Sequence, residues 1–330
     1  MAVTMAEITK LRKLSGAGMM DCKNALTEAE GDIDKAMEII RKKGQAVAAK
    51  RSDRDAAEGC VVAKTTGDFA AVIALKCETD FVAKNEDFVA LAKAILDAAV
   101  ENKCKTIEEV KALPMGNATV ADAVTDRSGI TGEKMELDGY MFVEGPATAI
   151  YNHQNKNSLC TIVAFNKAVD SAISHEVAMQ IAAMNPIAVD EAGVPESVKE
   201  AEIQVAIDKT KAEQVQKAVE AALKKAGFNL YIAENEEHLN EGIMKGSITE
   251  AQAEEIRQLK AKVAEEKAAN LPEQMIENIA KGRLAKFFKE VCLLNQEDIM
   301  DPKKTVREVL KEADPELQIV AFKRFTLRAE

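Results

Sequence analysis

The sequence predicts an α+β fold in which antiparallel sheets are flanked by helices. Apolar residues recur at helical spacing near both ends of the chain, whereas two clusters of strand-like segments occupy its middle, at 59–128 and 129–193. Aromatic residues make up only 4% of the chain and Trp is absent, so the cores must be built from aliphatic side chains and Met, a composition that favours helices. With 330 residues, the chain is long enough for two or three domains.

The N-terminal segment 1–44 is predicted to form three short helices. Apolar residues recur at intervals of three and four in three runs, and glycines separate the first run from the second. Asp32 is expected to cap the third helix and Gly44 to end it. A compact three-helix module should result, followed by a linker at 45–58 that lacks a clear apolar stripe and is partly helical at most.

The first strand-like cluster, at 59–128, begins with a predicted β-hairpin. Its strands are expected at 60–63 and 69–77, on either side of a turn that contains Gly. A helix is expected at 86–102, with Asn85 as its N-cap and acidic residues in its first turn. This cluster is the first of two predicted core subdomains.

The second cluster, at 129–193, follows a glycine-containing turn. Strands are expected at 135–143, 147–153 and 159–165, and a helix at 171–184. The middle of the chain therefore consists of two predicted αβ halves, each a hairpin or meander followed by a helix.

The last third of the chain is predicted to be mostly helical. Segment 194–271 contains two charged helical runs and is expected to form a helical hairpin, its second helix opened by the capping box Ser247-Ile248-Thr249-Glu250. Segment 272–330 is expected to hold a C-terminal helix and a closing strand at 318–327.

Charge and composition restrict the class of partner. The net charge of −11 argues against a nucleic-acid backbone, because phosphate binding needs a positive surface, whereas a protein partner fits. The N-terminus lacks the features of a signal peptide, and no apolar stretch is long enough to span a bilayer. The six cysteines are scattered without paired spacing, which speaks against disulfides and zinc and predicts buried thiols in the reducing cytoplasm.

Catalytic chemistry has no support at the level of motifs. His153, His175 and His238 are not spaced as metal ligands, and no His stands within a few residues of a Cys or Ser that would be activated. The chain contains neither a phosphate-cradling GxxxxGK nor a GxGxxG segment. We therefore expect no catalytic residues, no metal site and no cofactor.

The most informative segment is Thr79-Asp80-Phe81-Val82, where the second predicted strand gives way to the helix that begins at Glu86. An acidic and an aromatic residue stand together on this turn, and a turn side chain held by a scaffold is free to meet a partner. The alternative is a turn Asp followed by a Phe that packs into the core. The residues of this segment alone leave both interpretations open.

Met19 and Met20 form a second candidate contact at the start of the second predicted helix. Consecutive helical positions point in different directions, so one of the two is expected to be exposed in so small a module. His153 ends a predicted strand and is expected on the surface, and Gly132 is expected in a turn.

Three segments together resemble the family of bacterial elongation factor Ts, the guanine-nucleotide exchange factors of elongation factor Tu. They are residues 11–23, with Gly16-Ala17-Gly18-Met19-Met20; residues 77–84, with Thr79-Asp80-Phe81; and residues 282–287, Gly282-Arg283-Leu284-Ala285-Lys286-Phe287. The matches occur in the order of the family and are spread from the first helix to the last. The chain departs from the family at 194–271 and at Gln296-Glu297-Asp298-Ile299, where the family commonly has Gln-Pro-Phe-Val.

The resemblance implies an ubiquitin-associated-like domain at 1–44, a doubled core and a coiled-coil insertion. It also implies that the chain binds elongation factor Tu, in its GDP-bound and nucleotide-free forms, and stays bound until GTP binds. By the same resemblance, Phe81 enters the nucleotide-binding domain of the partner beside Asp80, Thr79 and Val82 and dislocates its magnesium ion. The residues that the resemblance assigns to other partner contacts are Arg12, Met19, Met20, Gly132 and His153.

Two other functions remain as alternatives. One is an adaptor or chaperone-like scaffold that binds through the three-helix module and the helical hairpin without accelerating exchange. The other is an enzyme that works through Asp80 and His153, for which no motif speaks. The sequence leaves open the oligomeric state, with a homodimer among the alternatives, and the role of the helical insertion.

Overall fold

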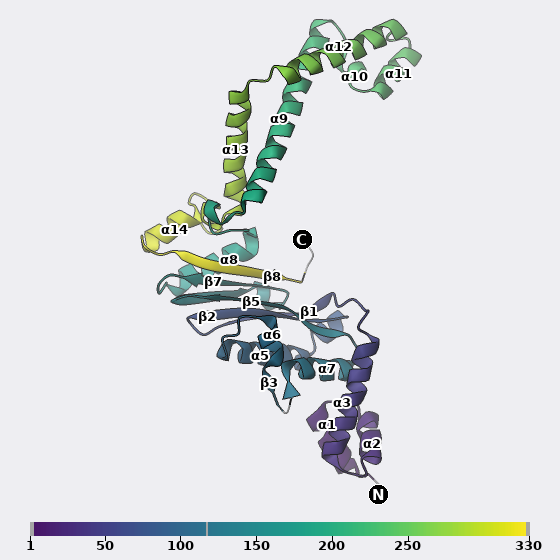
Figure 1. Cartoon of the computed structure of the whole chain (residues 1–330), viewed down its shortest axis with the longest axis vertical. Helices are drawn as coiled ribbons and strands as arrows, with labels where there is room; N and C mark the ends of the chain where they lie inside the picture. Colours follow the sequence, from purple (N-terminus) through teal and green to yellow (C-terminus); the bar gives the residue numbers. More distant parts are fainter. Residues whose placement is uncertain (1–2, 117, 328–330) are drawn as a thin grey trace. The chain divides into compact units, whose positions relative to one another are not determined.

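The computed structural model describes residues 3–116 and 118–327 and divides into two compact units (Figure 1). The first unit comprises Met1–Val189 and Gln296–Glu330, and the second comprises Asp190–Asn295. Helices and small antiparallel sheets occur together in the first unit, in agreement with the predicted α+β class.

Three helices form the N-terminal module: α1 (Met5–Ser15), α2 (Met19–Glu28) and α3 (Ile33–Lys50). They enclose a small core, and Asp32 caps α3 by accepting backbone hydrogen bonds, as predicted. The prediction that α3 ends at Gly44 is wrong. Gly44 is buried within α3, where its backbone approaches Gly129, so this glycine serves a close helix contact instead of a helix end.

The first sheet has the antiparallel order β1 (Glu58–Thr65), β2 (Phe69–Cys77) and β5 (Met135–Glu144). The predicted hairpin of β1 and β2 is confirmed by their ladder. The assignment of β5 to a second αβ half is wrong, because β5 pairs with β2 along its length. Strand β2 is therefore the central strand of this sheet. Its side chains enter one apolar cluster on each face of the sheet, which explains why its sequence is apolar almost throughout.

Helices cover one face of the first sheet: α5 (Glu86–Glu101), α6 (Ile107–Ala112) and α7 (Val120–Thr131) (Figure 1). The predicted helix with its Asn85 cap is confirmed as α5, whereas α6 and α7 were not predicted. A short ribbon of β3 (Pro114–Met115) and β4 (Ala118–Thr119) separates those two. Between β2 and α5 stands the single turn α4 (Asp80–Ala83).

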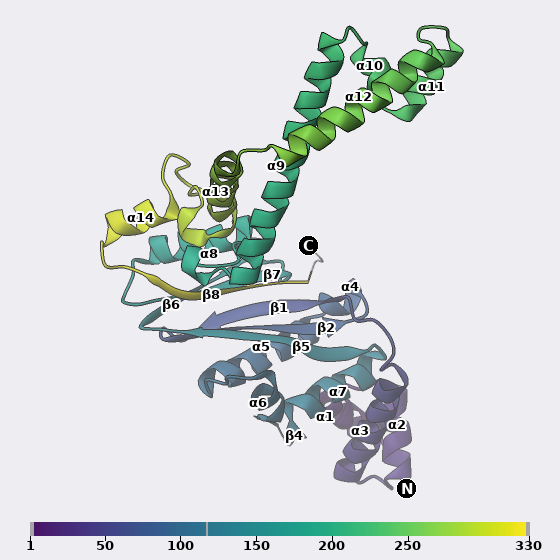
Figure 2. The same ribbon diagram turned by 45° about the horizontal axis from the view of Figure 1, so that its top comes forward.

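The second sheet has the antiparallel order β6 (Ala147–Asn152), β7 (Leu159–Phe165) and β8 (Ile319–Thr326). It stacks on the other face of the first sheet, and side chains of β1, β2 and β7 share one apolar cluster (Figure 2). Helix α8 (Ser171–Met184), predicted with these bounds, packs on β6 and β7. The closing strand is confirmed as β8, and α14 (Val306–Ala313), which was not predicted, precedes it.

The second unit is helical throughout its described residues, apart from its connecting segments. Its elements are η2 (Glu191–Gly193), α9 (Glu196–Lys225), α10 (Leu230–Ala233), α11 (Glu236–Met244), α12 (Glu250–Ala269), α13 (Glu273–Val291) and η3 (Leu293–Asn295).

The hairpin predicted at 194–271 is formed by α9 and α12, but the unit extends further because α13 also packs along α9. The capping box of α12 pairs Thr249 with Gln252 and not with the predicted residues, since Thr249 is the residue with extended backbone before the first helical turn. Among the described residues, no helix is long and apolar enough to cross a membrane.

The crossing of α3 and α7 gives a stability test. A Cβ on Gly129 would lie 2.1 Å from the Gly44 Cα atom, so Gly129→Ala forces the helices apart. We expect it to lower the free energy of unfolding by about 1–3 kcal/mol, the usual cost of overpacking, measured by urea unfolding followed by circular dichroism.

Gly44→Ala is the matched control for this variant. Its Cβ would meet the Gly129 Cα atom at 3.4 Å, an ordinary contact, and Ala is the better helix former. Equal destabilisation by the two substitutions would contradict the asymmetry of the crossing.

Candidate functional site

The turn α4 presents Phe81 to solvent. The Phe81 side chain is 83% exposed, so the interpretation that places it in the core is wrong. Thr79 caps the turn, its hydroxyl accepting a hydrogen bond from the Val82 N–H at 3.4 Å. Asp80 is paired with Lys84 at 2.6 Å, and this hydrogen bond lowers the pKa of the Asp80 carboxyl. An aromatic side chain thus protrudes beside a carboxylate that is ionised at neutral pH.

Glu133 holds α4 in place from the end of α7. Its carboxylate accepts hydrogen bonds from the Thr79 N–H at 3.1 Å and from the Thr79 hydroxyl at 2.6 Å. The preceding residue, Gly132, is the left-handed C-cap of α7, with φ of 73°. The structure therefore brings Gly132 next to the α4 turn, and Val82 packs on the core behind it.

Glu78 provides a second anchor one residue before the capping Thr79. It accepts a hydrogen bond from the Lys134 N–H at 2.6 Å and ion pairs with Arg51 at 2.9 Å and Arg54 at 3.4 Å. The hydrogen bond from Lys134, aided by Arg51, lowers the pKa of the Glu78 carboxyl. This anchor therefore stabilises the fold above the ordinary Glu pKa of about 4.3, and its contribution is lost as the pH falls through the lowered value.

Sequence analysis missed both anchoring carboxylates. In a chain with 30% charged residues, a single Glu before a turn or after a glycine carries no signal of its own. Thr79 and Glu133 are 54 positions apart, so their hydrogen bonds depend on how β2 and β5 pair.

The N-terminal module carries the other exposed apolar pair. Met19 is 46% exposed and Met20 is 63% exposed at the start of α2, so both side chains face solvent, where only one was predicted to do so. Arg12 is exposed on α1. These three residues lie on the module, apart from the α4 turn that follows β2.

His153 lies on the second sheet, in the 3-10 turn η1 (His153–Asn155) that follows β6. Its Nδ1 atom is 3.3 Å from the Tyr151 hydroxyl, and the side chain is half-buried. Gln154 adopts φ of 54°, in the left-handed region that favours glycine. The loop is tied to the first sheet by the Val61 N–H, which donates to the Asn157 carbonyl at 2.7 Å.

The divergent loop at 296–299 turns its polar side chains inward. Gln296 and Asp298 are buried, and Gln180 of α8 donates to the Gln296 side chain at 3.2 Å while accepting from the Ile299 N–H at 2.9 Å. The Asp298 carboxylate accepts from the backbone N–H of Met300 at 2.9 Å. Hydrogen bonds to Gln180 of α8 thus hold this loop in place.

The described residues offer no site for covalent or metal chemistry. They contain no cluster of three or more His, Cys, Asp or Glu side chains that could hold a metal ion. All six cysteines are buried, as predicted, and burial raises the pKa of Cys77 and of Cys160 to about 12. Thiols with such pKa values are protonated at neutral pH and are poor nucleophiles.

An exposed aromatic side chain on an anchored turn is typical of proteins that dock on another protein. Residues 78–329 match the protein family described as elongation factor TS. The chain is 79% identical to elongation factor Ts of Phocaeicola vulgatus, 75% to that of Parabacteroides distasonis and 74% to that of Bacteroides thetaiotaomicron, each over 100% of both chains.

The chain therefore belongs to the elongation factor Ts family, which confirms the resemblance carried by the three sequence segments. It is a nucleotide exchange factor of translation elongation, with elongation factor Tu as its partner and the cytoplasm as its location, and it is not an enzyme.

The anchor at Glu133 gives a test of how α4 is held. Glu133→Ala removes both hydrogen bonds to Thr79. We expect amide hydrogen exchange in α4 to accelerate on the order of tenfold, the effect of losing about 1.4 kcal/mol, measured by mass spectrometry at fixed pH.

Glu101→Ala, a change at an exposed position at the end of α5, is the control and should leave exchange in α4 unaltered. Unchanged exchange in the Glu133 variant would show that the cap of Thr79 and the packing of Val82 hold α4 without this anchor.

Proposed function

We propose that the protein accelerates GDP release by inserting Phe81 between helices of the nucleotide-binding domain of elongation factor Tu, with Asp80 beside it. The observation that carries this proposal is the 83% exposure of Phe81 on a turn anchored by Glu133 and Glu78. A large apolar side chain that is exposed yet held rigidly loses little conformational freedom on binding, as a docking anchor requires.

The insertion acts on the magnesium ion of the partner. Groups that arrange the ion are displaced, and loss of Mg²⁺ removes the cation that neutralises the diphosphate of GDP. By thermodynamic linkage, the factor and the nucleotide weaken each other's binding to elongation factor Tu by the same amount, so the binding of GTP promotes dissociation of the factor. No covalent step and no cofactor of this chain are needed.

The proposal is tested by the release of a fluorescent GDP analogue from elongation factor Tu, chased with unlabelled nucleotide. Strong acceleration at substoichiometric amounts of this protein is expected. The adaptor alternative predicts equal affinity for the GDP-bound and nucleotide-free partner and no acceleration, whereas an exchange factor must prefer the nucleotide-free form.

Phe81→Ala tests the role of the protruding ring. We expect stimulated GDP release to slow by on the order of tenfold or more, because truncating an aromatic side chain that becomes buried in the complex costs about 2 kcal/mol or more. The rate is measured at saturating factor, and circular dichroism verifies the fold.

The matched control for this variant is Met244→Ala, which removes an apolar side chain that is 88% exposed on a different element, α11. We expect the Met244 variant to stimulate GDP release from elongation factor Tu at the same rate as the unsubstituted protein. An unchanged rate in a folded Phe81 variant would remove the basis of the insertion mechanism.

The methionine pair is proposed to add docking energy without taking part in nucleotide displacement. Met19→Ala combined with Met20→Ala should weaken the complex with nucleotide-free elongation factor Tu by about tenfold, measured by isothermal titration calorimetry. The GDP release rate at saturating factor should stay the same. A lower rate at saturation, or an unchanged affinity, would contradict this division of roles.

A further inference from the structure

The loop that carries His153 holds several residues in a backbone conformation that favours glycine. Gln154, Asn155 and Asn157 have φ angles of 54°, 53° and 52°, in the left-handed region. Asn152 at the end of β6 braces the loop, because its Nδ2 atom donates to the Asn157 Oδ1 atom at 2.8 Å. Backbone strain of this kind persists only where the surroundings enforce it, and it is frequent at binding sites. The loop is therefore a candidate for a contact that depends on the placement of a side chain.

Tyr151 of β6 lies beside two imidazole rings. Its ring centroid is 5.9 Å from that of His153 and 5.4 Å from that of His175, and both contacts are edge-to-face, with interplanar angles of 61° and 74°. His175 belongs to α8, which is fastened to the sheet where the Thr161 hydroxyl donates to the Ala178 carbonyl at 2.7 Å. Thr161 stands opposite Tyr151 in the ladder of β6 and β7. Contacts with α8 thus hold the Tyr151 ring in its orientation toward His153.

The Tyr151 hydroxyl and the His153 Nδ1 atom are 3.3 Å apart. A phenolic O–H is a stronger proton donor than an imidazole N–H, and an imidazole nitrogen is a stronger acceptor than a phenolic oxygen, so the hydroxyl donates to Nδ1. A neutral imidazole carries one ring proton, and the hydrogen bond at one nitrogen decides which nitrogen holds it. Donation to Nδ1 therefore places the proton of His153 on Nε2.

We propose that Tyr151 is a positioning residue for His153. It holds the imidazole in one orientation and in the Nε2–H tautomer, so that His153 presents an N–H donor to an acceptor oxygen of the partner. Among the described residues, only the Tyr151 hydroxyl hydrogen-bonds to the imidazole, and it does so at Nδ1. Nε2–H is thus left for a contact outside the chain, and it selects a carbonyl or carboxylate oxygen over an N–H group.

The consequence for complex formation rests on the proposed docking on elongation factor Tu, whereas the tautomer of His153 does not. The family resemblance assigns a partner contact to His153 and gives no role to Tyr151. An imidazole that is already oriented loses less conformational freedom on binding than one that rotates. Tyr151 therefore strengthens the contact by acting through His153.

The tautomer is tested by ¹⁵N NMR of the labelled full chain, alone in solution, on the alkaline plateau of the histidine titration. The chain has three histidines, and the signals of His153 are those that His153→Ala removes. We expect a protonated Nε2 and an unprotonated Nδ1 at His153 in the unsubstituted protein. Tyr151→Phe keeps the ring and removes the hydroxyl, so the Nδ1 signal should shift and an Nδ1–H form should appear.

The effect on docking is measured as the affinity for nucleotide-free elongation factor Tu, by isothermal titration calorimetry. Tyr151→Phe should weaken the complex about three- to tenfold, the range expected for the loss of one hydrogen bond. In a chain that already carries His153→Ala, the same substitution should cause no further loss, because the hydroxyl then has no imidazole to orient.

Tyr140→Phe is the matched control. It also removes one hydroxyl, which donates to the Cys104 carbonyl at 2.7 Å on the first sheet. This variant should leave both the His153 signals and the affinity unaltered. Circular dichroism verifies the fold of each variant.

An unchanged Nδ1 signal in the Tyr151 variant would overturn the positioning of His153. Equal losses of affinity from Tyr151→Phe with and without His153 would overturn its action through the imidazole. If His153→Ala alone bound as tightly as the unsubstituted protein, the docking contact of His153 would fail. The NMR result is obtained without elongation factor Tu, so a failure of the tautomer is distinct from a failure of the proposed docking.

Discussion

The first unit depends on one constraint, the burial of both faces of strand β2. Its side chains alternate between two cores: Phe69, Ile73 and Leu75 face the helices α5 and α7, while Val72 and Ala74 face the second sheet. Large residues fill the space under the helices, and the small residues on the other face let the two sheets approach. A charged residue on either face would have no solvent to reach, which accounts for the unbroken apolar run from Phe69 to Leu75.

The exposed Phe81 follows directly from this buried strand. Since β2 ends in the core, the chain leaves it along a defined path, and hydrogen bonds from Thr79 to Glu133 and from Lys134 to Glu78 fix the first turn outside. Val82 returns to the core, so one residue of the turn is left pointing outward. The backbone on both sides of Phe81 is anchored, and an anchored backbone has less conformational freedom to lose when the side chain docks.

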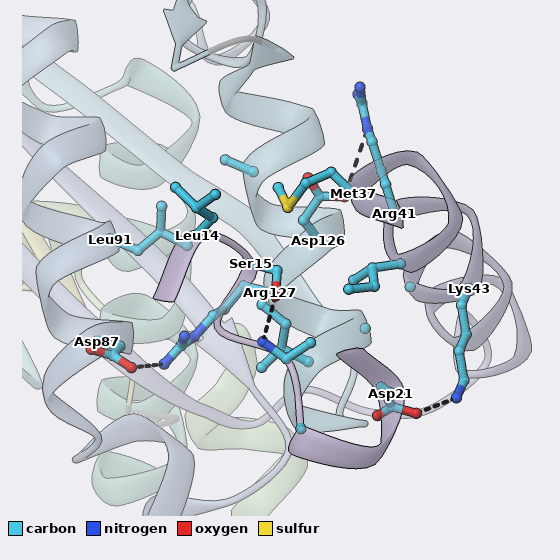
Figure 3. Close-up of a pocket in the computed structure, with 17 residues that line it drawn as sticks. Leu14, Ser15, Asp21, Met37, Arg41, Lys43, Asp87, Leu91, Asp126 and Arg127 are labelled. Atoms are coloured by element: carbon cyan, nitrogen blue, oxygen red, sulfur yellow. Dashed lines mark hydrogen bonds and ion pairs between the residues drawn. The ribbon is translucent and has the colours of Figure 1, made fainter. Parts of the chain in front are cut away.

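Hydrogen bonds and ion pairs of polar side chains also hold parts of the first unit together. The buried side chains of Gln180, Gln296 and Asp298 fasten a loop to α8 through hydrogen bonds to side chains and backbone. The joint between the three-helix module and α7 is charged instead, because Arg41 of α3 pairs with Asp122 at 2.6 Å and with Asp126 at 3.7 Å (Figure 3), both on α7. A satisfied polar network rigidifies a fold.

The sequence by itself determined the local elements and the position of the turn that carries Phe81. The hairpin of β1 and β2, helix α5 with its Asn85 cap, helix α8 and strand β8 all follow from short-range periodicity and capping, which act within a few residues. The segment around Phe81 was recognisable as a turn for the same reason. Its exposure could not be predicted, since a Phe beside a strand end packs inward in most proteins.

Only the tertiary structure decided which strands share a sheet and what holds the site. Strand β5 joins the first sheet and β8 joins the second. The alternation of residues along these strands does not predict their partners, because every antiparallel strand offers the same backbone hydrogen-bonding groups at its edge. Likewise, Gly44 carried the signal of a helix end, but α3 continues through it, and Gly44 packs against Gly129 of α7, the position where only a glycine fits. Glu133 meets Thr79 only once β5 lies beside β2. Which strands pair depends on the apolar surface that the whole sheet buries, and no local sequence pattern carries that information.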